Sequence, residues 1–260
     1  MWMLASSIYA GCKWLTWRRT PVRGAPIWQQ AGYLLAWPGL DAAAFLTPTS
    51  MSGVSKPTQK EWVFALIKFA SGIWIVFGAV RLVPAAHPYL IGWVGMIGIV
   101  LMLHFGMFHL LSCGWRRIGV DARPLMNRPL ASTSVSEFWG RRWNTAFRDL
   151  THRFLYRPLT TQLDVRWAVL AGFVFSGLVH ELVISVPARG GYGGPTLFFG
   201  VQGTAILFER SPLGRNLSLE THWRGWLFTM LVLLTPVYCL FHPPFVEGIV
   251  VPFLRALDAL

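Results

Sequence analysis

The sequence is poor in charge and in cysteine. Charged residues make up 13% of its 260 residues and hydrophobic residues 54%, whereas soluble domains usually carry about 25% charged residues. The three cysteines, Cys12, Cys113 and Cys239, are odd in number and widely spaced. This spacing argues against a disulfide framework and against a CxxC metal or redox unit. The composition instead predicts a protein that lies in a membrane.

Acidic residues are scarce as well. The chain has 11 Asp and Glu against 23 Lys and Arg, which gives a formal net charge of +12. The basic residues lie between apolar segments, where the positive-inside rule and anionic lipid headgroups account for them. We therefore expect membrane lipids as partners and no nucleic acid, with part of the charge available to a substrate that carries phosphate.

Several motifs of soluble enzymes are missing. There is no GxSxG nucleophile elbow. The Gly-rich turn 190–194 lacks the Lys-Ser/Thr ending of a phosphate-binding loop, and His180-Glu181 lacks the second histidine of a zinc-protease helix. His104 and His109 are five residues apart and do not share a helix face. With the cysteines not placed to help, we expect no metal site.

Long apolar runs dominate the chain. A membrane span needs about 20 mostly apolar residues, and the sequence predicts an all-α polytopic integral membrane protein with five to seven membrane segments. The basic cluster near the start follows an apolar stretch, so no cleavable signal peptide is expected. We expect one membrane-embedded domain over residues 1–260. The full-length windows are Trp62–Val83, Tyr89–Ser112, Trp167–Pro187 and Gly225–Phe241, and the shorter or weaker ones are Met1–Trp17, Ile27–Phe45 and Pro195–Phe208.

The distribution of arginine predicts a topology. The polar stretch Cys113–Arg166 contains ten arginines, whereas Arg189–Gly194 carries a single charge. The positive-inside rule therefore places the first stretch in the cytoplasm and the second on the opposite side. The membrane is expected to be the bacterial inner membrane, or the endoplasmic reticulum in a eukaryote.

The cytoplasmic stretch contains a predicted helix start. Ser134 is followed three residues later by Glu137, the pattern of a capping box. Arginines and aromatic residues, among them Trp139 and Trp143, alternate after it. The pattern predicts one amphipathic helix at the membrane interface, with tryptophan at headgroup level and arginine toward phosphate.

Ionisable residues inside apolar spans are costly and are functional candidates by default. His180 is 13 residues into its span, about 20 Å along a helix. Ser176 precedes it by four residues and shares its face, beside the small Gly172 and Gly177. Such a face suits either a cavity that admits a substrate or close helix packing, and spacing alone does not separate the two. The other candidates are His104, His109, Lys68, Arg81 and Glu181.

Two segments together resemble a known family. Residues 136–144 read SEFWGRRWN, and residues 176–181 read SGLVHE after an interval of 31 residues. This ordered pair resembles the membrane-bound O-acyltransferase (MBOAT) superfamily, and its wax synthase branch in particular. Residues 36–41, AWPGLD, resemble an upstream segment of the same branch.

The resemblance implies that Asn144 and His180 are the catalytic residues. It also implies that an acyl-CoA donor enters from the cytoplasmic side and an alcohol accepts the acyl group. A neutral imidazole can take the proton of the attacking hydroxyl, and an Asn amide can donate to the developing oxyanion. We assign substrate binding to Trp139, Arg141, Arg142, Trp143, Ser176 and Glu181.

Some alternatives remain open at this point. The arginines hold donor phosphates in one interpretation and anchor the interface in the other. The acceptor is a long-chain alcohol, a sterol-like alcohol or a smaller hydroxyl compound. No cofactor is expected beyond acyl-CoA as donor substrate. A non-catalytic lipid-binding or transport component, and an O-acyltransferase for a polysaccharide or peptide hydroxyl, are the rival functions.

Overall fold

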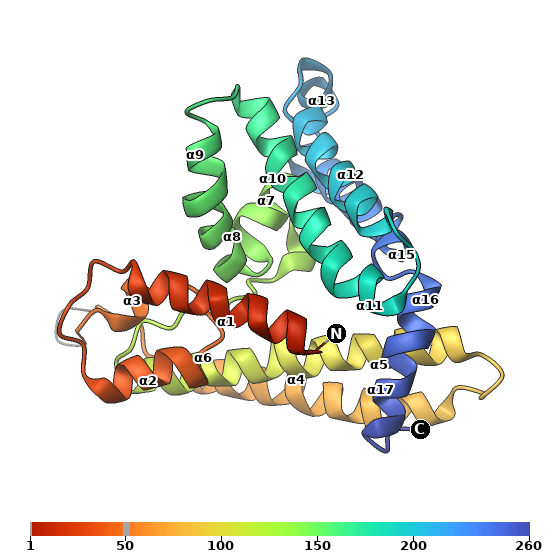
Figure 1. Ribbon diagram of the computed structural model, residues 1–260, viewed down its shortest axis with the longest axis horizontal. Helices are drawn as coiled ribbons and strands as arrows, with labels where there is room; N and C mark the ends of the chain where they lie inside the picture. Colours follow the sequence, from red (N-terminus) through yellow and green to blue (C-terminus); the bar gives the residue numbers. More distant parts are fainter. Residues whose placement is uncertain (1, 49–52) are drawn as a thin grey trace. The chain divides into compact units, whose positions relative to one another are not determined.

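The computed structural model describes residues 2–48 and 53–260 as helices joined by turns, without a strand among those residues (Figure 1). The all-α prediction is confirmed. The described chain divides into two compact units, one formed by residues 5–126 with 253–260 and the other by residues 127–252 with 2–4. The expectation of a single domain stays a prediction.

Four helical stretches are long and apolar enough to cross a membrane, which confirms a polytopic membrane protein. The 17-residue α1 (Trp2–Arg18), the 10-residue α2 (Ile27–Ala36) and the 16-residue α12 (Gly194–Glu209) are shorter. At 1.5 Å per residue α12 rises about 24 Å, less than the ~30 Å hydrocarbon core. Membrane segments beyond the four stay an expectation. The four candidate spans, at the predicted places, are Gln59–Leu82, Pro88–Arg117, Val165–Ala188 and His222–Leu240.

The first unit is built on two long antiparallel helical stretches. α4 (Gln59–Phe77) packs against α5 (Pro88–Val100) and its continuation (Figure 1). Gly72 and Gly106 lie where the backbones are too close for a Cβ atom, as expected where small residues let helices approach. The remaining elements are α3 (Ala42–Leu46), η2 (Ala79–Leu82), the π-helical η3 (Leu101–Met107) and α6 (Phe108–Arg117).

The second unit is centred on α10 (Val165–His180) and α12, which run side by side (Figure 1). A Cβ atom on Gly177 would lie 2.6 Å from the Cα atom of Thr196, so glycine is needed for this approach. The other elements are η4 (Pro129–Ala131), α7 (Val135–Glu137), η5 (Phe138–Arg142), α8 (Thr145–Thr151), η6 (His152–Tyr156), α9 (Arg157–Leu159), η7 (Glu181–Ser185), α11 (Val186–Ala188), α13 (Pro212–Asn216), α14 (His222–Leu234), α15 (Val237–Leu240), α16 (Pro243–Phe245) and η8 (Val246–Val250). α17 (Val251–Ala256) follows, and most of it belongs to the first unit.

The predicted helix after Ser134 begins as expected but does not continue. The Ser134 hydroxyl accepts a hydrogen bond from the backbone N–H of Glu137 at 3.0 Å. The helix then passes into π-helical η5 and breaks, because Trp143 is extended and Asn144 has a left-handed backbone (φ 40°, ψ 63°). The expectation of one continuous amphipathic helix is therefore wrong. Asn is among the few residue types that adopt this conformation readily.

Candidate active site

His180 is the last residue of α10, directly before the π-helical η7. Its Nδ1 atom lies 2.7 Å from the carbonyl oxygen of Ser176. Because a carbonyl oxygen only accepts, Nδ1 carries the hydrogen in the neutral ring and Nε2 keeps a free lone pair. The ring also lies 4.5 Å, centroid to centroid, from that of Phe199 on α12. In this tautomer the half-buried imidazole has a nitrogen, Nε2, that can accept a proton.

Ser176 acts on His180 through its backbone. Its side-chain hydroxyl donates to the carbonyl oxygen of Gly172 at 3.0 Å, within the same helix. The Ser176 carbonyl is the acceptor that fixes the His180 ring. In this arrangement Ser176 positions the histidine, while its assignment to substrate binding stays a prediction.

Trp139, in the first of the two family-like segments, packs against α10 and α12 near His180 of the second. Its ring centroid lies 5.8 Å from that of Phe173 on α10 and 5.5 Å from that of Phe199 on α12. Phe199 is also the aromatic neighbour of His180. A single phenylalanine therefore contacts both the FWGRRWN segment and the candidate base.

Trp143 and Asn144 form the break between η5 and α8. The Trp143 ring stacks on Phe138 at 5.5 Å with an interplanar angle of 14°. Phe138 is buried with Met230 and Leu233 of α14. This stack fixes the backbone just before Asn144, whose positive φ then starts α8.

Arg141 and Arg142, the two arginines of the FWGRRWN segment, differ in their contacts. Arg142 forms an ion pair with Glu137 (Nη2 to Oε1, 2.7 Å), and its Nη1 atom donates to the carbonyl oxygen of Arg128 at 3.3 Å. Burial raises the pKa of Glu137, but the Thr133 N–H and the Arg142 guanidinium outweigh it and lower that pKa below its ordinary value. Arg141 is exposed, and no ion pair or hydrogen bond of its side chain is found within residues 2–48 and 53–260. Arg142 is thus held by Glu137 and by the carbonyl oxygen of Arg128, whereas Arg141 is available to a ligand.

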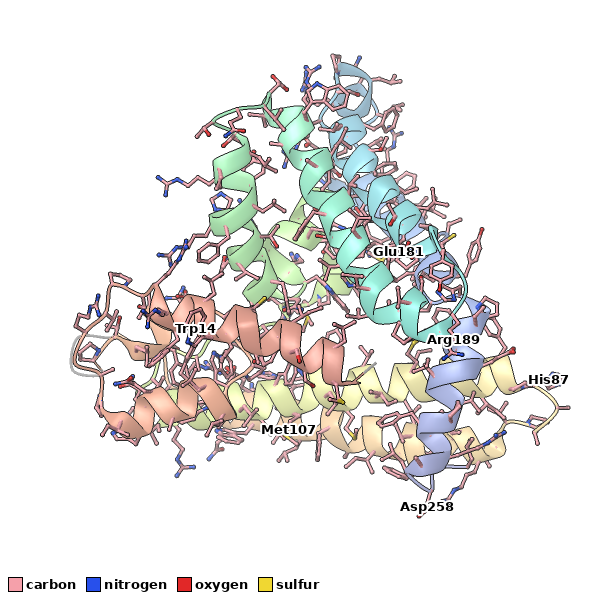
Figure 2. All side chains as sticks on the ribbon, in the orientation of Figure 1. Trp14, His87, Met107, Glu181, Arg189 and Asp258 are labelled. Carbon is pink, nitrogen blue, oxygen red and sulfur yellow. The ribbon has the colours of Figure 1, made fainter. Side chains whose placement is uncertain are left out.

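Glu181, the residue after His180, faces the start of α12 (Figure 2). Its Oε1 atom accepts hydrogen bonds from the backbone N–H of Thr196 at 3.1 Å and from the Thr196 hydroxyl at 3.0 Å. Its Oε2 atom is buried, without a partner in the described part of the chain. A carboxylate at this position satisfies one of the free N–H groups of the first helical turn.

Sequence reasoning missed two residues on α12. Gln202 and Glu209 are fully buried. Gln202 bonds the indole of Trp139, and Glu209 bonds the backbone of Val135 and Ser136. The signal was present, because both are polar residues in or at the end of an apolar run, where such groups are functional candidates.

The first unit brings together a cluster that the sequence did not predict. Ligand atoms of Glu61, His109 and Cys113 lie within 4.8 Å of one another, so the expectation that the cysteines are not placed to help a metal site is wrong for Cys113. Arg116 bonds Glu61, and Lys68 Nζ lies 2.7 Å from His109 Nδ1. A divalent cation would have to displace two positive side chains, so the local charge disfavours a metal ion.

An open apolar groove of about 580 Å³ lies on the α10 and α12 surface. None of the predicted site residues is among those that line it, and such a surface is expected where helices face lipid acyl chains. Its lining residues are Leu163, Trp167, Leu170, Ala171, Val174, Gly200 and Thr204.

Comparison with known proteins supports the resemblance. Residues 122–201 match the model of the "Membrane bound O-acyl transferase family". The chain is 38% identical over 73 residues to a long-chain-alcohol O-fatty-acyltransferase of Simmondsia chinensis, covering 25% of this chain and 21% of that protein. It is 33% identical over 103 residues to the probable long-chain-alcohol O-fatty-acyltransferase 8 of Arabidopsis thaliana, covering 36% and 31%.

A further Arabidopsis relative, the probable long-chain-alcohol O-fatty-acyltransferase 7, is 27% identical over 145 residues, covering 50% of this chain and 42% of that protein. The chain thus spans less than half the length of each of these relatives. The family match contains all the predicted site residues, from Trp139 to Glu181. Residues 122–201 are therefore similar to the membrane-bound O-acyltransferase family, and parts of the chain are similar to long-chain-alcohol O-fatty-acyltransferases, the wax synthase branch that the motifs resemble.

Proposed function

We propose that this protein is a membrane-embedded O-acyltransferase that moves a fatty acyl chain from acyl-CoA to the hydroxyl of an alcohol, with His180 as general base. The observation that carries the proposal is the hydrogen bond from His180 Nδ1 to the Ser176 carbonyl. It leaves Nε2 unprotonated in the neutral ring, which is the state that accepts a hydroxyl proton.

The proposed reaction is one displacement at the thioester carbonyl. The alcohol oxygen attacks the carbonyl carbon while its proton passes to His180 Nε2. The C–S bond then breaks, the acyl group remains on the alcohol as an ester, and the proton moves from the imidazolium to the departing sulfur, giving free CoA thiol. No covalent acyl-enzyme is required.

Asn144 is the proposed oxyanion donor, since a side-chain amide can stabilise the charge that develops on the carbonyl oxygen. The exposed guanidinium of Arg141 is available to the phosphates of the donor. Arg142, by contrast, already pairs with Glu137. The names of the relatives support a long-chain alcohol as acceptor and a fatty acyl group as cargo.

The test of this function uses the full chain, purified in detergent and incubated with labelled acyl-CoA and a panel of alcohols. We expect labelled ester with long-chain alcohols. Ester on a polysaccharide or peptide hydroxyl instead would move the assignment to the rival enzyme class. Donor binding without transfer to any acceptor would support a lipid-binding or transport component.

Substitution of the base gives the first prediction. His180→Ala should lower turnover by about 10²–10⁴-fold, the usual contribution of a general base, with melting temperature and donor affinity unchanged. His152→Ala, at an exposed histidine of the same unit, is the matched control and should keep activity. A stable His180→Ala protein with normal turnover would end the assignment. Joint loss of stability and donor binding would instead indicate helix packing.

A further inference from the structure

One face of α12 carries both aromatic and polar contacts of the candidate site. Phe199, Gln202, Ile206 and Glu209 follow one another at intervals of three, four and three residues, the spacing of a single helix face. Phe199 contacts His180 at one end of this face. Ile206 packs with Val135 in one hydrophobic cluster. The face therefore extends from the candidate base to α7, which directly precedes the FWGRRWN segment (residues 138–144), about 15 Å along the helix.

Glu209 binds α7, directly before that segment. Its Oε2 atom accepts from the backbone N–H of Val135 at 2.8 Å, and its Oε1 atom accepts from the N–H of Ser136 at 2.8 Å and from the Ser136 hydroxyl. The side chain is fully buried. Burial raises the pKa of Glu209, and the donors of Ser136 and Val135 offset part of this rise. Hydrogen bonds to a carboxylate are stronger than those between neutral groups.

Gln202 binds Trp139 of the FWGRRWN segment, about one helical turn after the α7 residues that Glu209 binds. Its Oε1 atom accepts from the indole N–H of Trp139 at 3.3 Å, while its Nε2 atom donates to the carbonyl oxygen of Val232 at 2.9 Å. The indole only donates and the carbonyl only accepts, so the amide has one orientation. Gln202 is fully buried as well, and loss of either bond leaves a buried polar atom unpaired.

We propose that Gln202 and Glu209 are positioning residues of the candidate active site, which set the placement of the FWGRRWN segment relative to His180. The segment needs such external support, because α7 has only three residues and the chain breaks again at Asn144. Both residues lie outside residues 122–201, the part that matches the family model. The inference rests on the proposed acyl transfer.

The test compares Glu209→Gln and Gln202→Met with the wild type. Gln has the size of Glu but turns one acceptor into a donor that faces an N–H group. Met keeps the length of Gln and removes both hydrogen bonds. Thr229→Val is the matched control, because Thr229 is also fully buried and, among residues 2–48 and 53–260, its hydroxyl bonds only Gly225 of its own helix. Ser136→Ala removes one donor to Glu209 and leaves both amides, and serves if Glu209→Gln does not fold.

Four quantities are measured on each preparation: turnover, Michaelis constants, melting temperature, and hydrogen exchange of peptides from residues 133–147. We expect turnover per folded molecule to fall, by up to about 10²-fold as displaced catalytic groups often cost. The Michaelis constant for acyl-CoA should change little, and exchange should rise in these peptides. Thr229→Val should change none of these. The Glu209→Gln and Ser136→Ala changes should be less than additive, because they act on one contact.

Wild-type turnover and exchange in the variants would overturn the proposal. So would a lower melting temperature with unchanged turnover per folded molecule, which indicates a merely structural role. If the wild-type protein itself transfers no acyl group, the proposed function fails. In that case unchanged hydrogen exchange in the variants would reject the positioning role as well. Raised exchange would show that Gln202 and Glu209 still hold the FWGRRWN segment against α12.

Discussion

Asn144 combines an unusual backbone with a side chain that fits the proposed chemistry. Its φ of 40° lies in the left-handed region, which costs most non-glycine residues about 1–2 kcal/mol. The amide is the proposed oxyanion donor. A substitution by alanine alone would change both properties at once.

Two substitutions separate the effect of the Asn144 backbone from that of its side-chain amide. Asn144→Gly keeps the left-handed backbone and removes the amide, whereas Asn144→Ala strains the backbone as well. We expect both to lower turnover by about 10²–10³-fold, the usual value of one oxyanion donor. Only the alanine variant should lose stability, by about 1 kcal/mol. Kinetics and denaturant unfolding on the same preparations check this, and an active glycine variant would show that only the backbone matters.

The Glu137 carboxylate gives a prediction on pH. Its pKa is lowered below the ordinary value of 4.5, since the Thr133 N–H and Arg142 outweigh the opposing effect of burial. A lowered folded-state pKa contributes stability that is present above the unfolded value and is lost as pH falls through the folded one. Glu137→Gln should therefore lower the melting temperature near neutral pH, with the difference from wild type shrinking as pH falls below about 4.5.

Melting curves between about pH 3 and pH 7 measure this difference. Glu247→Gln, at an exposed carboxyl group of the same unit, is the control and should show little effect at any pH. A difference for Glu137→Gln that grows with acidity would have the wrong sign for the ion pair with Arg142.

Among the elements, the junction of η7 with α12 combines packing and hydrogen bonding. Gly177 allows α10 to approach Thr196, and Glu181 binds the N–H and hydroxyl of that same threonine. The helix that presents His180 is thus fixed to the helix that presents Phe199.

Glu181 variants test this junction. Glu181→Gln keeps an oxygen for Thr196 and should have near-normal stability, whereas Glu181→Ala leaves the half-buried donors of Thr196 without this acceptor and should lose about 1 kcal/mol of unfolding free energy. Unfolding curves and donor titrations check the outcome. Equal stability of both variants, with a raised Michaelis constant in each, would favour the alternative role of Glu181 in substrate binding.

The same elements show why some features could be predicted and others could not. The helix start at Ser134 depends on residues three apart, and local capping is visible in the sequence. The break at Asn144 was not predicted, because the interrupted helix is supported by Glu209, more than 60 residues further along the chain. Periodicity alone describes a continuous helix there.

For the molecule as a whole, topology stays a prediction. In a cysteine-free protein, a cysteine at Leu130 or at Tyr192, both exposed, can be labelled with a membrane-impermeant maleimide in sealed vesicles. Ten arginines in Cys113–Arg166 predict that Leu130 lies in the cytoplasm and Tyr192 on the other side. Labelling of both positions from one side would contradict this topology. Detergent-permeabilised vesicles, in which both react, are the control.

By itself the sequence determined the helical class, the four long apolar helices and the resemblance to the membrane-bound O-acyltransferase family, because hydropathy, composition and contiguous motifs are properties of short stretches. The sequence also identified His180 as a candidate site residue, since a histidine inside an apolar run can be recognised without knowledge of the fold. Only the tertiary structure decided that Phe199 lies against both Trp139 and His180, that Arg142 is engaged by Glu137, and that Gln202 and Glu209 bind the motif. These contacts join residues up to 74 positions apart, and packing between helices brings them together.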